Sequence, residues 1–183
     1  MRLFIAINFD EKTKAGIGKA IEGLKPYAIK GRFTHMDNLH LTLVFIGETV
    51  KLSQVKEAMD ELRAPSFTLV IQGFGRFCRP GGDICWLGVA ENEILANIYA
   101  QLSESLSQKG FVLERRPYKP HLTLGRELVL KEEINPREFQ KTIEPMRLEV
   151  AKISLMQSER IAGRLKYTEI YSRELTGDEE AEN

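Results

Sequence analysis

The sequence predicts a duplicated α+β fold with two lobes related by a pseudo-two-fold axis. Three observations predict it. A His-Leu-Thr-Leu motif occurs twice, beginning at His40 and at His121, an offset of 81 residues. Segments with strand character recur at the same offset, and segments with helical periodicity lie between them. We therefore expect mostly antiparallel sheets that form a central cleft, with helices packed outside.

The expected strands are short runs rich in β-branched and aromatic residues. Residues 3–8 (LFIAIN) shifted by 81 coincide with residues 84–89 (ICWLGV), and residues 67–74 (FTLVIQGF) coincide with residues 148–155 (LEVAKISL). A further run at 165–172 would complete the sheets. Because these runs partly alternate between apolar and polar residues, each predicts one strand with a buried face.

Four segments have the spacing of amphipathic helices, namely 11–25, 52–63, 92–109 and 135–142. Asp10 and Asn92 stand at the starts of two of them, where a side-chain oxygen can cap the first free N–H groups. Gly110 is a C-terminal stop signal, and Pro136 is compatible with a first helical turn.

The length of 183 residues suits a single two-lobed domain, which we expect to span residues 1–176. Its sequence halves are about 1–80 and 82–175, and the two lobes remain free to share strands. Residues 177–183 are acidic and hold no large apolar side chain, so we expect this tail to be disordered. With 43% hydrophobic and 28% charged residues, the remainder can form a core and a charged surface.

The charge and cysteine content narrow the class of partner. The formal net charge is +0, which argues against a basic field that holds long nucleic acid, so an RNA partner should be short or held at one local patch. No apolar run is long enough to cross a membrane. Cys78 and Cys85 form neither a CxxC motif nor a disulfide framework. We expect a cytoplasmic monomer with reduced thiols.

The repeated motif brings polar side chains together. Residues i and i+2 of a strand share a face, so His40 lies beside Thr42 and His121 beside Thr123, with leucines on the opposite face. A pseudo-two-fold axis would bring the two pairs face to face across one cleft. Burying both pairs without partners would cost free energy, so a solvated cleft with a ligand is the better explanation.

Paired imidazoles predict acid–base chemistry. A neutral imidazole can take the proton of an attacking water, while a charged one protonates a departing oxygen. The hydroxyls of Thr42 and Thr123 can donate hydrogen bonds to the oxygens on which negative charge grows. Neither step requires a metal or a cofactor. The third histidine, His35, lies outside both motifs, and we expect it to be non-catalytic.

The motifs and their flanks resemble the two-histidine (2H) phosphoesterases. RLFIAI at the start, NLHLTLVFIGE, RPYKPHLTLGR and the closing ISLMQSERIAGRLKYTEIYSREL are similar to bacterial and archaeal RNA 2′,3′-cyclic phosphodiesterases, also called LigT-type 2′-5′ RNA ligases. The resemblance covers about residues 2–175. It departs where the family often has Trp before the first motif, because the aromatic residue here is Phe33.

The resemblance implies metal-independent hydrolysis of RNA or nucleoside 2′,3′-cyclic phosphates to 2′-phosphates, with reversible 2′-5′ ligation. It makes His40 the proton donor and His121 the proton acceptor. The near-symmetric halves do not themselves decide these roles.

The roles of Arg126 and Phe45 depend on which face of the strand their side chains occupy. Strict alternation from Thr123 places Arg126 on the face away from the cleft unless the strand bulges or ends there. Its long side chain could still reach the phosphate, and a solvated strand-end arginine is the alternative. Phe45 could stack on a base, although core packing is the stronger expectation.

Tyr118 and Lys119 precede the second motif and are further candidates for RNA contact. The ring of Tyr118 could stack on a base. Lys119, with the nearby Arg115 and Arg116, could touch the RNA backbone. A solvated loop explains this basic cluster equally well.

Three other functions compete with cyclic phosphate hydrolysis. A module that binds phosphate or nucleotide without turnover would be expected to lose a histidine, and both are present. A metal hydrolase would use His35, His40 and His121, but no acidic residue stands beside either motif on the cleft face. A phosphodiesterase acting on linear 2′-5′ oligonucleotides remains open.

Overall fold

A computed structural model describes residues 1–176, and the acidic tail 177–183 lies outside the described residues. Nine strands and four α-helices make up the described chain. In order they are β1 (Arg2–Asn8), α1 (Glu11–Leu24), β2 (Ala28–Phe33), β3 (His40–Glu48), α2 (Leu52–Asp60), β4 (Phe67–Phe77), β5 (Asp83–Val89), α3 (Glu93–Gln108), β6 (His121–Leu130), α4 (Pro136–Lys141), β7 (Met146–Val150), β8 (Lys152–Ile161) and β9 (Arg164–Glu174). The predicted α+β class is confirmed.

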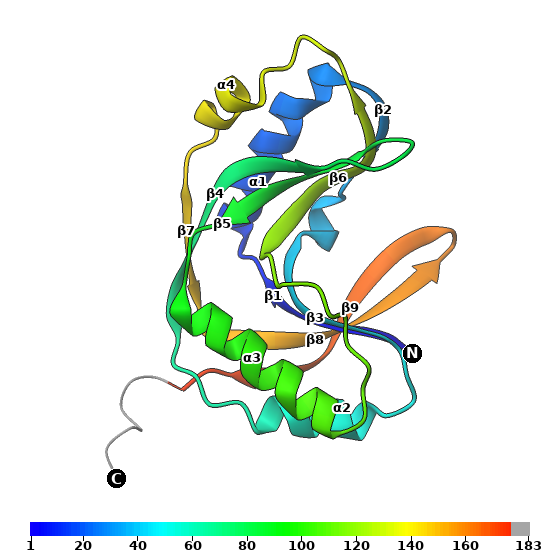
Figure 1. The fold of residues 1–183 in the computed structure, drawn as a ribbon, viewed down its shortest axis with the longest axis vertical. Coiled ribbons are helices and arrows are strands. Elements are labelled where there is room, and N and C mark those ends of the chain that lie inside the picture. The colour runs from blue at the N-terminus through cyan, green and yellow to red at the C-terminus, as the bar shows by residue number, and fades with distance from the viewer. Residues whose placement is uncertain (177–183) are drawn as a thin grey trace.

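The strands form two antiparallel sheets. One has four strands in the order β3-β1-β8-β9, and the other has five in the order β2-β6-β5-β4-β7. Each sheet takes strands from both sequence halves, because β8 and β9 join β1 and β3 while β2 and β4 join β5, β6 and β7. In Figure 1, α1 and α4 cover the outer face of the five-stranded sheet, and α2 and α3 cover the four-stranded sheet.

The expectation of one strand at 148–155 is wrong. β7 ends at Val150 in the five-stranded sheet, and β8 begins at Lys152 in the other sheet. Ala151 lies between them, and its carbonyl oxygen accepts a hydrogen bond from the N–H of Leu175 at 2.7 Å. Buried residues stand on both sides of the break, at Val150 and Ile153. Because the apolar pattern continues across it, the sequence carries no sign that the chain changes sheets.

Strand β2 was not expected. Four of its six residues are exposed, so it has no apolar alternation to signal a strand. It forms an edge of the five-stranded sheet, and its only strand partner among the described residues is β6. The pairing therefore depends on backbone hydrogen bonds to β6, which the sequence of β2 does not reveal.

The helix boundaries follow the expected capping signals. The Asp10 carboxylate accepts a hydrogen bond from the N–H of Thr13 at 2.7 Å, and the Asn92 side chain accepts one from the N–H of Leu95 at 2.9 Å. Gly110 follows α3 with a φ of 80°, a conformation that favours glycine. These caps settle where α1 and α3 begin and so how both helices leave the strands before them.

Candidate active site

Both motifs lie at the starts of strands, with the expected alternation. Leu41 and Leu43 of β3 and Leu122 and Leu124 of β6 are at most 2% exposed and pack into the core. The histidine and threonine of each motif are half-buried on the other face. The leucines therefore anchor each strand, and the polar pair is held on the opposite side of the sheet.

Each histidine is oriented by the backbone two residues before it. Nδ1 of His40 lies 2.7 Å from the carbonyl oxygen of Asn38, and Nδ1 of His121 lies 2.7 Å from that of Lys119. A carbonyl oxygen only accepts, so Nδ1 carries the proton and donates in both cases. In the neutral form each imidazole then keeps its lone pair on Nε2, which is the nitrogen that can take up a proton.

Aromatic rings wall both imidazoles. The His40 ring lies 4.9 Å from Phe4 and 5.1 Å from Tyr167, measured between centroids. The His121 ring lies 5.0 Å from Phe77 and 6.0 Å from Trp86. None of these four residues was expected in the site from the sequence. They come from strands β1, β4, β5 and β9, and no motif links them to the histidines.

Electrostatics connects the two motifs to one arginine. The pKa of both histidines is lowered, in each case first by burial, against the raising effect of the backbone hydrogen bond. The positive charge of Arg126 lowers both values further. The charge of His121 also lowers the pKa of His40, and the charge of Lys119 lowers the pKa of His121. Arg126 therefore lies within electrostatic reach of both histidines.

A bulge in each motif strand decides on which sheet face the side chains of Phe45 and Arg126 lie. In β3, Ile5 of β1 pairs with Val44 and Ala6 pairs with Thr42, so Leu43 is the extra residue. In β6 the same shift makes Leu124 extra, because Cys85 pairs with Gly125 and Trp86 with Thr123. The alternation therefore resumes one position later, and Phe45 in β3 and Arg126 in β6, each two residues after the extra leucine, lie on the face of the threonines.

The core packing expected for Phe45 is wrong, because the bulge turns its side chain out of the core. Its side chain is 47% exposed, and the guanidinium of Arg2 lies 5.0 Å from its ring centroid. Arg126 occupies the equivalent place in the second motif and is exposed. The duplicated backbone thus presents an aromatic ring at one position and a cation at the other.

The threonines are held by different neighbours. Thr42 Oγ1 lies 3.0 Å from Nε2 of His40, and the hydroxyl of Tyr118 donates to the Thr42 carbonyl oxygen at 3.0 Å. The Thr123 carbonyl oxygen instead accepts a hydrogen bond from the hydroxyl of Thr34 at 2.8 Å. Tyr118 also stacks on Tyr99, with 4.2 Å between centroids, and burial raises its pKa. Both the hydroxyl and the ring of Tyr118 therefore have partners within the protein.

The basic residues before the second motif lie in two different environments. Lys119 places its ammonium 4.7 Å from the Trp86 ring centroid and 5.4 Å from that of Phe77. Arg115 and Arg116 are exposed, and Arg116 pairs with a neighbouring glutamate in the loop. Only Lys119 of this cluster is thus shown against the aromatic wall of His121.

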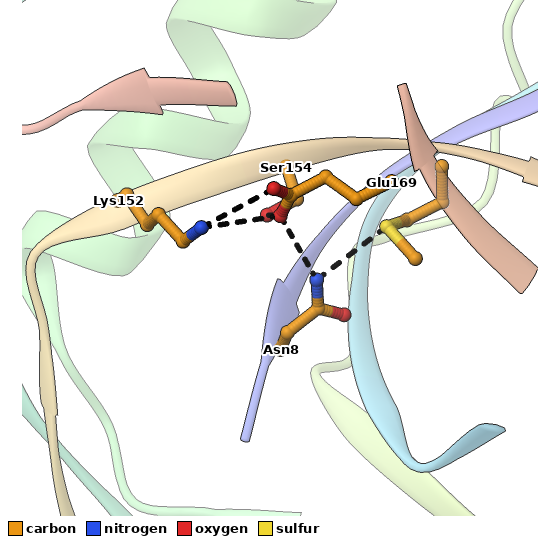
Figure 2. Close-up of polar contacts among 5 residues, drawn as sticks. Asn8, Lys152, Ser154 and Glu169 are labelled. Atoms are coloured by element: carbon orange, nitrogen blue, oxygen red, sulfur yellow. Dashed lines mark hydrogen bonds and ion pairs between the residues drawn. The ribbon is translucent and has the colours of Figure 1, made fainter. Parts of the chain in front are cut away.

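A polar cluster fills the sheet face beside His40. Asn8 pairs with His40 across β1 and β3, and its amide nitrogen lies 3.4 Å from Glu169 Oε2 (Figure 2). Ser154 and Lys152 of β8 donate to the same carboxylate at 2.5 and 3.3 Å. Burial alone would raise the pKa of Glu169, but these hydrogen bonds and the Lys152 charge hold it below its ordinary value.

Within residues 1–176, no three His, Cys, Asp or Glu side chains are grouped to hold a metal ion. His35 is exposed, and its Nδ1 lies 3.4 Å from a carboxylate oxygen of Asp37. In the same part of the chain, no helix is long and apolar enough to span a membrane.

Comparison with known proteins agrees with this geometry. The family model described as the 2′-5′ RNA ligase superfamily matches residues 14–162. An RNA 2′,3′-cyclic phosphodiesterase of Thermotoga maritima is 37% identical over 131 residues, which cover 69% of this chain and 70% of that protein. Its Escherichia coli counterpart is 30% identical over 149 residues, covering 80% and 81%.

Solved structures extend the match to the whole fold. The crystal structure of E. coli LigT in its apo form superimposes with a TM-score of 0.80 at 28% identity, covering 96% of this chain and 97% of that one. The structure of E. coli LigT complexed with 3′-AMP gives the same TM-score and covers 98% of that chain. The fold and the two motifs define a 2H phosphoesterase. The chain belongs to the LigT-like RNA 2′,3′-cyclic phosphodiesterase family of the 2′-5′ RNA ligase superfamily.

Proposed function

We propose that this protein hydrolyses the 2′,3′-cyclic phosphate of an RNA end or nucleoside to a 2′-phosphate, by general acid–base catalysis without a metal. In the same site, an RNA 5′-hydroxyl replacing water would give reversible 2′-5′ ligation. The observation that carries the proposal is the pair of histidines with Nδ1 held by backbone carbonyls and a shared Arg126. The E. coli relative solved with 3′-AMP supports a nucleotide as ligand.

The reaction needs one neutral and one charged imidazole. A neutral Nε2 removes the proton of the attacking water, and a protonated Nε2 supplies a proton to the departing 3′-oxygen. In the free protein both histidines are biased toward the neutral form, because burial and Arg126 lower both pKa values. The negative charge of a bound cyclic phosphate offsets this bias, so substrate binding favours protonation of one histidine.

We assign His121 as the base and His40 as the acid, the roles that the resemblance to the 2H phosphoesterases implies. Lys119 adds a second cation near His121, and its charge lowers the pKa of this histidine only. When the phosphate compensates Arg126, Lys119 still favours neutral His121. The charge of His121 likewise lowers the pKa of His40, so protonation of both histidines together is disfavoured and one of them stays neutral.

The remaining site residues stabilise the charge that develops on phosphorus. The hydroxyls of Thr42 and Thr123 donate to the two non-bridging oxygens, and the Arg126 guanidinium neutralises them. A bound phosphate displaces the Thr42 hydroxyl from its present contact with Nε2 of His40. Phe45, beside Arg2, and Lys119, over the Trp86 ring, are the residues that we propose contact the base or the RNA backbone.

The test is turnover of cytidine 2′,3′-cyclic phosphate in excess chelator, with the product isomer identified by phosphorus NMR. We expect full activity and a 2′-phosphate, because neither proton transfer needs a Lewis acid. Activity that vanishes with chelator and returns with zinc or manganese would contradict the two-histidine mechanism. Binding without turnover would instead identify a non-catalytic nucleotide-binding module.

A further inference from the structure

The two sides of the site differ in the space beside each histidine. Asn8, which pairs with His40 across two strands, belongs to the polar cluster that fills its sheet face (Figure 2). Gly88 pairs with His121 at the matching place and has no side chain. A pocket of about 700 Å³ lies there, with Trp86, Gly88 and Lys119 among its walls. This volume is typical of small-molecule sites.

Glycines make the pocket and position its aromatic wall. Gly75 of β4 pairs with Trp86, and a Cβ at this glycine would overlap the indole ring. A Cβ at Gly88 would lie 2.9 Å from the carbonyl oxygen of Gln72 and 3.4 Å from the indole. Larger residues would push the indole off the sheet or narrow the pocket. Trp86 therefore lies against β4 at the side of the open space.

The lining has the chemistry of a nucleoside site. The Phe77 ring lies 5.1 Å from Trp86 and 5.0 Å from His121, so aromatic surface continues from the catalytic imidazole to the pocket. Aromatic rings of this kind stack on unpaired bases. Gln72 and Glu91 offer hydrogen-bonding groups for base edges or ribose. The flexible Lys119 side chain now over Trp86 can move aside and contact a phosphate.

The direction of attack decides which nucleoside this pocket receives. Displacement at phosphorus is in line, so the nucleophile enters opposite the departing 3′-oxygen. If His121 removes the nucleophile's proton, the nucleophile arrives on the side of Trp86, and the ribose of the cyclic phosphate lies on the side of His40. A water molecule occupies only about 30 Å³. A pocket of about 700 Å³ can receive a whole nucleoside that carries the nucleophilic hydroxyl.

The geometry points to this pocket as the subsite for the 5′-terminal nucleoside of an RNA with a free 5′-hydroxyl. This inference rests on the proposed function. The 5′-oxygen forms a bond to phosphorus as the bond from phosphorus to the 3′-oxygen breaks. His121 takes the proton of the 5′-hydroxyl, and His40 gives a proton to the 3′-oxygen. The product is a 2′-5′ phosphodiester, and the step consumes no further reactant.

The experiment offers adenosine as acceptor with cytidine 2′,3′-cyclic phosphate as donor, and separates hydrolysis from transfer by chromatography. We expect a 2′-5′ dinucleoside phosphate whose formation saturates with adenosine. Adenosine 5′-phosphate, whose 5′-oxygen is blocked, should compete for the pocket without forming this product. Saturation and competition together would indicate a defined binding site for the acceptor.

Variants test the location. Gln72→Trp fills the pocket and Trp86→Leu removes the stacking surface, so each should lower the ratio of transfer to hydrolysis. The loss of one stacked base corresponds to roughly 5- to 150-fold. As a control, Gln108→Trp makes the same Gln-to-Trp substitution on α3, which covers the other sheet, and it should leave the ratio of transfer to hydrolysis unchanged.

The outcomes separate this inference from the proposed function. Normal hydrolysis with no transfer, or transfer that persists in Gln72→Trp and Trp86→Leu, would overturn the acceptor subsite alone. A raised KM for the cyclic phosphate in these variants would also overturn it, because the pocket would then hold the cyclic nucleotide. If the unaltered protein turns over no cyclic phosphate, the proposed function itself fails.

Discussion

The first and second motifs share a backbone and differ in what surrounds it. Both histidines bond through Nδ1 to the carbonyl two residues earlier, and both strands carry a bulge after the threonine. Around His40 the sheet face is filled by a polar cluster, whereas around His121 it is open and lined by Trp86. The difference teaches that a duplicated scaffold can place two identical side chains in different surroundings.

Replacing each histidine should have the largest effect on kcat, and it tests whether the two histidines have different roles. His40→Ala and His121→Ala should each lower kcat by roughly 10²–10⁴, the usual contribution of a proton-transfer group. A nitrophenyl phosphodiester, whose leaving group needs no proton, should restore much of the rate of His40→Ala. It should not restore His121→Ala, which cannot activate water. Rescue of His121→Ala alone would reverse the roles, and rescue of neither would count against acid–base catalysis by this pair.

The threonines should give smaller and unequal effects. Thr42→Ala and Thr123→Ala should each lower kcat by roughly 10–10³, as loss of one transition-state donor does. Of the two threonines, only Thr42 is within hydrogen-bond distance of a histidine Nε2 in the described chain. Thr42→Ala should therefore also change the pH profile of kcat/KM, and Thr42→Ser should restore it. Identical pH profiles for the two alanine variants would show that this contact has no role in solution.

The residues after the bulges test the comparison between a cation and an aromatic ring. Arg126→Met should lower kcat/KM by roughly 10- to 100-fold, in keeping with loss of a hydrogen bond to a charged group. Its loss should also raise the pKa of both histidines, because its charge lowers both. Phe45→Ala at the equivalent position should cost less than about tenfold. Equal losses at the two positions would argue against phosphate binding by Arg126.

The smallest expected effect is a shift in pH dependence. Both free-protein histidine pKa values lie below the ordinary 6.5, so the optimum of kcat/KM should lie on the acid side of that value. Lys119→Met removes a cation that lowers the pKa of His121, so one limb of the profile should move to higher pH. Lys56→Met removes a surface lysine over Tyr171 and serves as the control. An unshifted profile in Lys119→Met would remove the electrostatic argument for the base.

The sequence alone determined the elements that depend on local pattern. Alternation of leucine with His and Thr placed both polar pairs on one strand face, and the side-chain caps at Asp10 and Asn92 located two helices. The repeat also predicted that the fold is duplicated. These features survive in sequence because strand period and capping act over a few residues.

Only the tertiary structure decided what depends on the partner strand. The chain changes sheets at Ala151 without a break in its apolar pattern. The bulges that turn Phe45 and Arg126 toward the threonines exist only as register shifts against β1 and β5. The rings around the histidines and the pocket beside Trp86 join strands far apart in the chain. Such features arise from nonlocal pairing, and a single sequence carries no local periodicity that encodes which strands will meet.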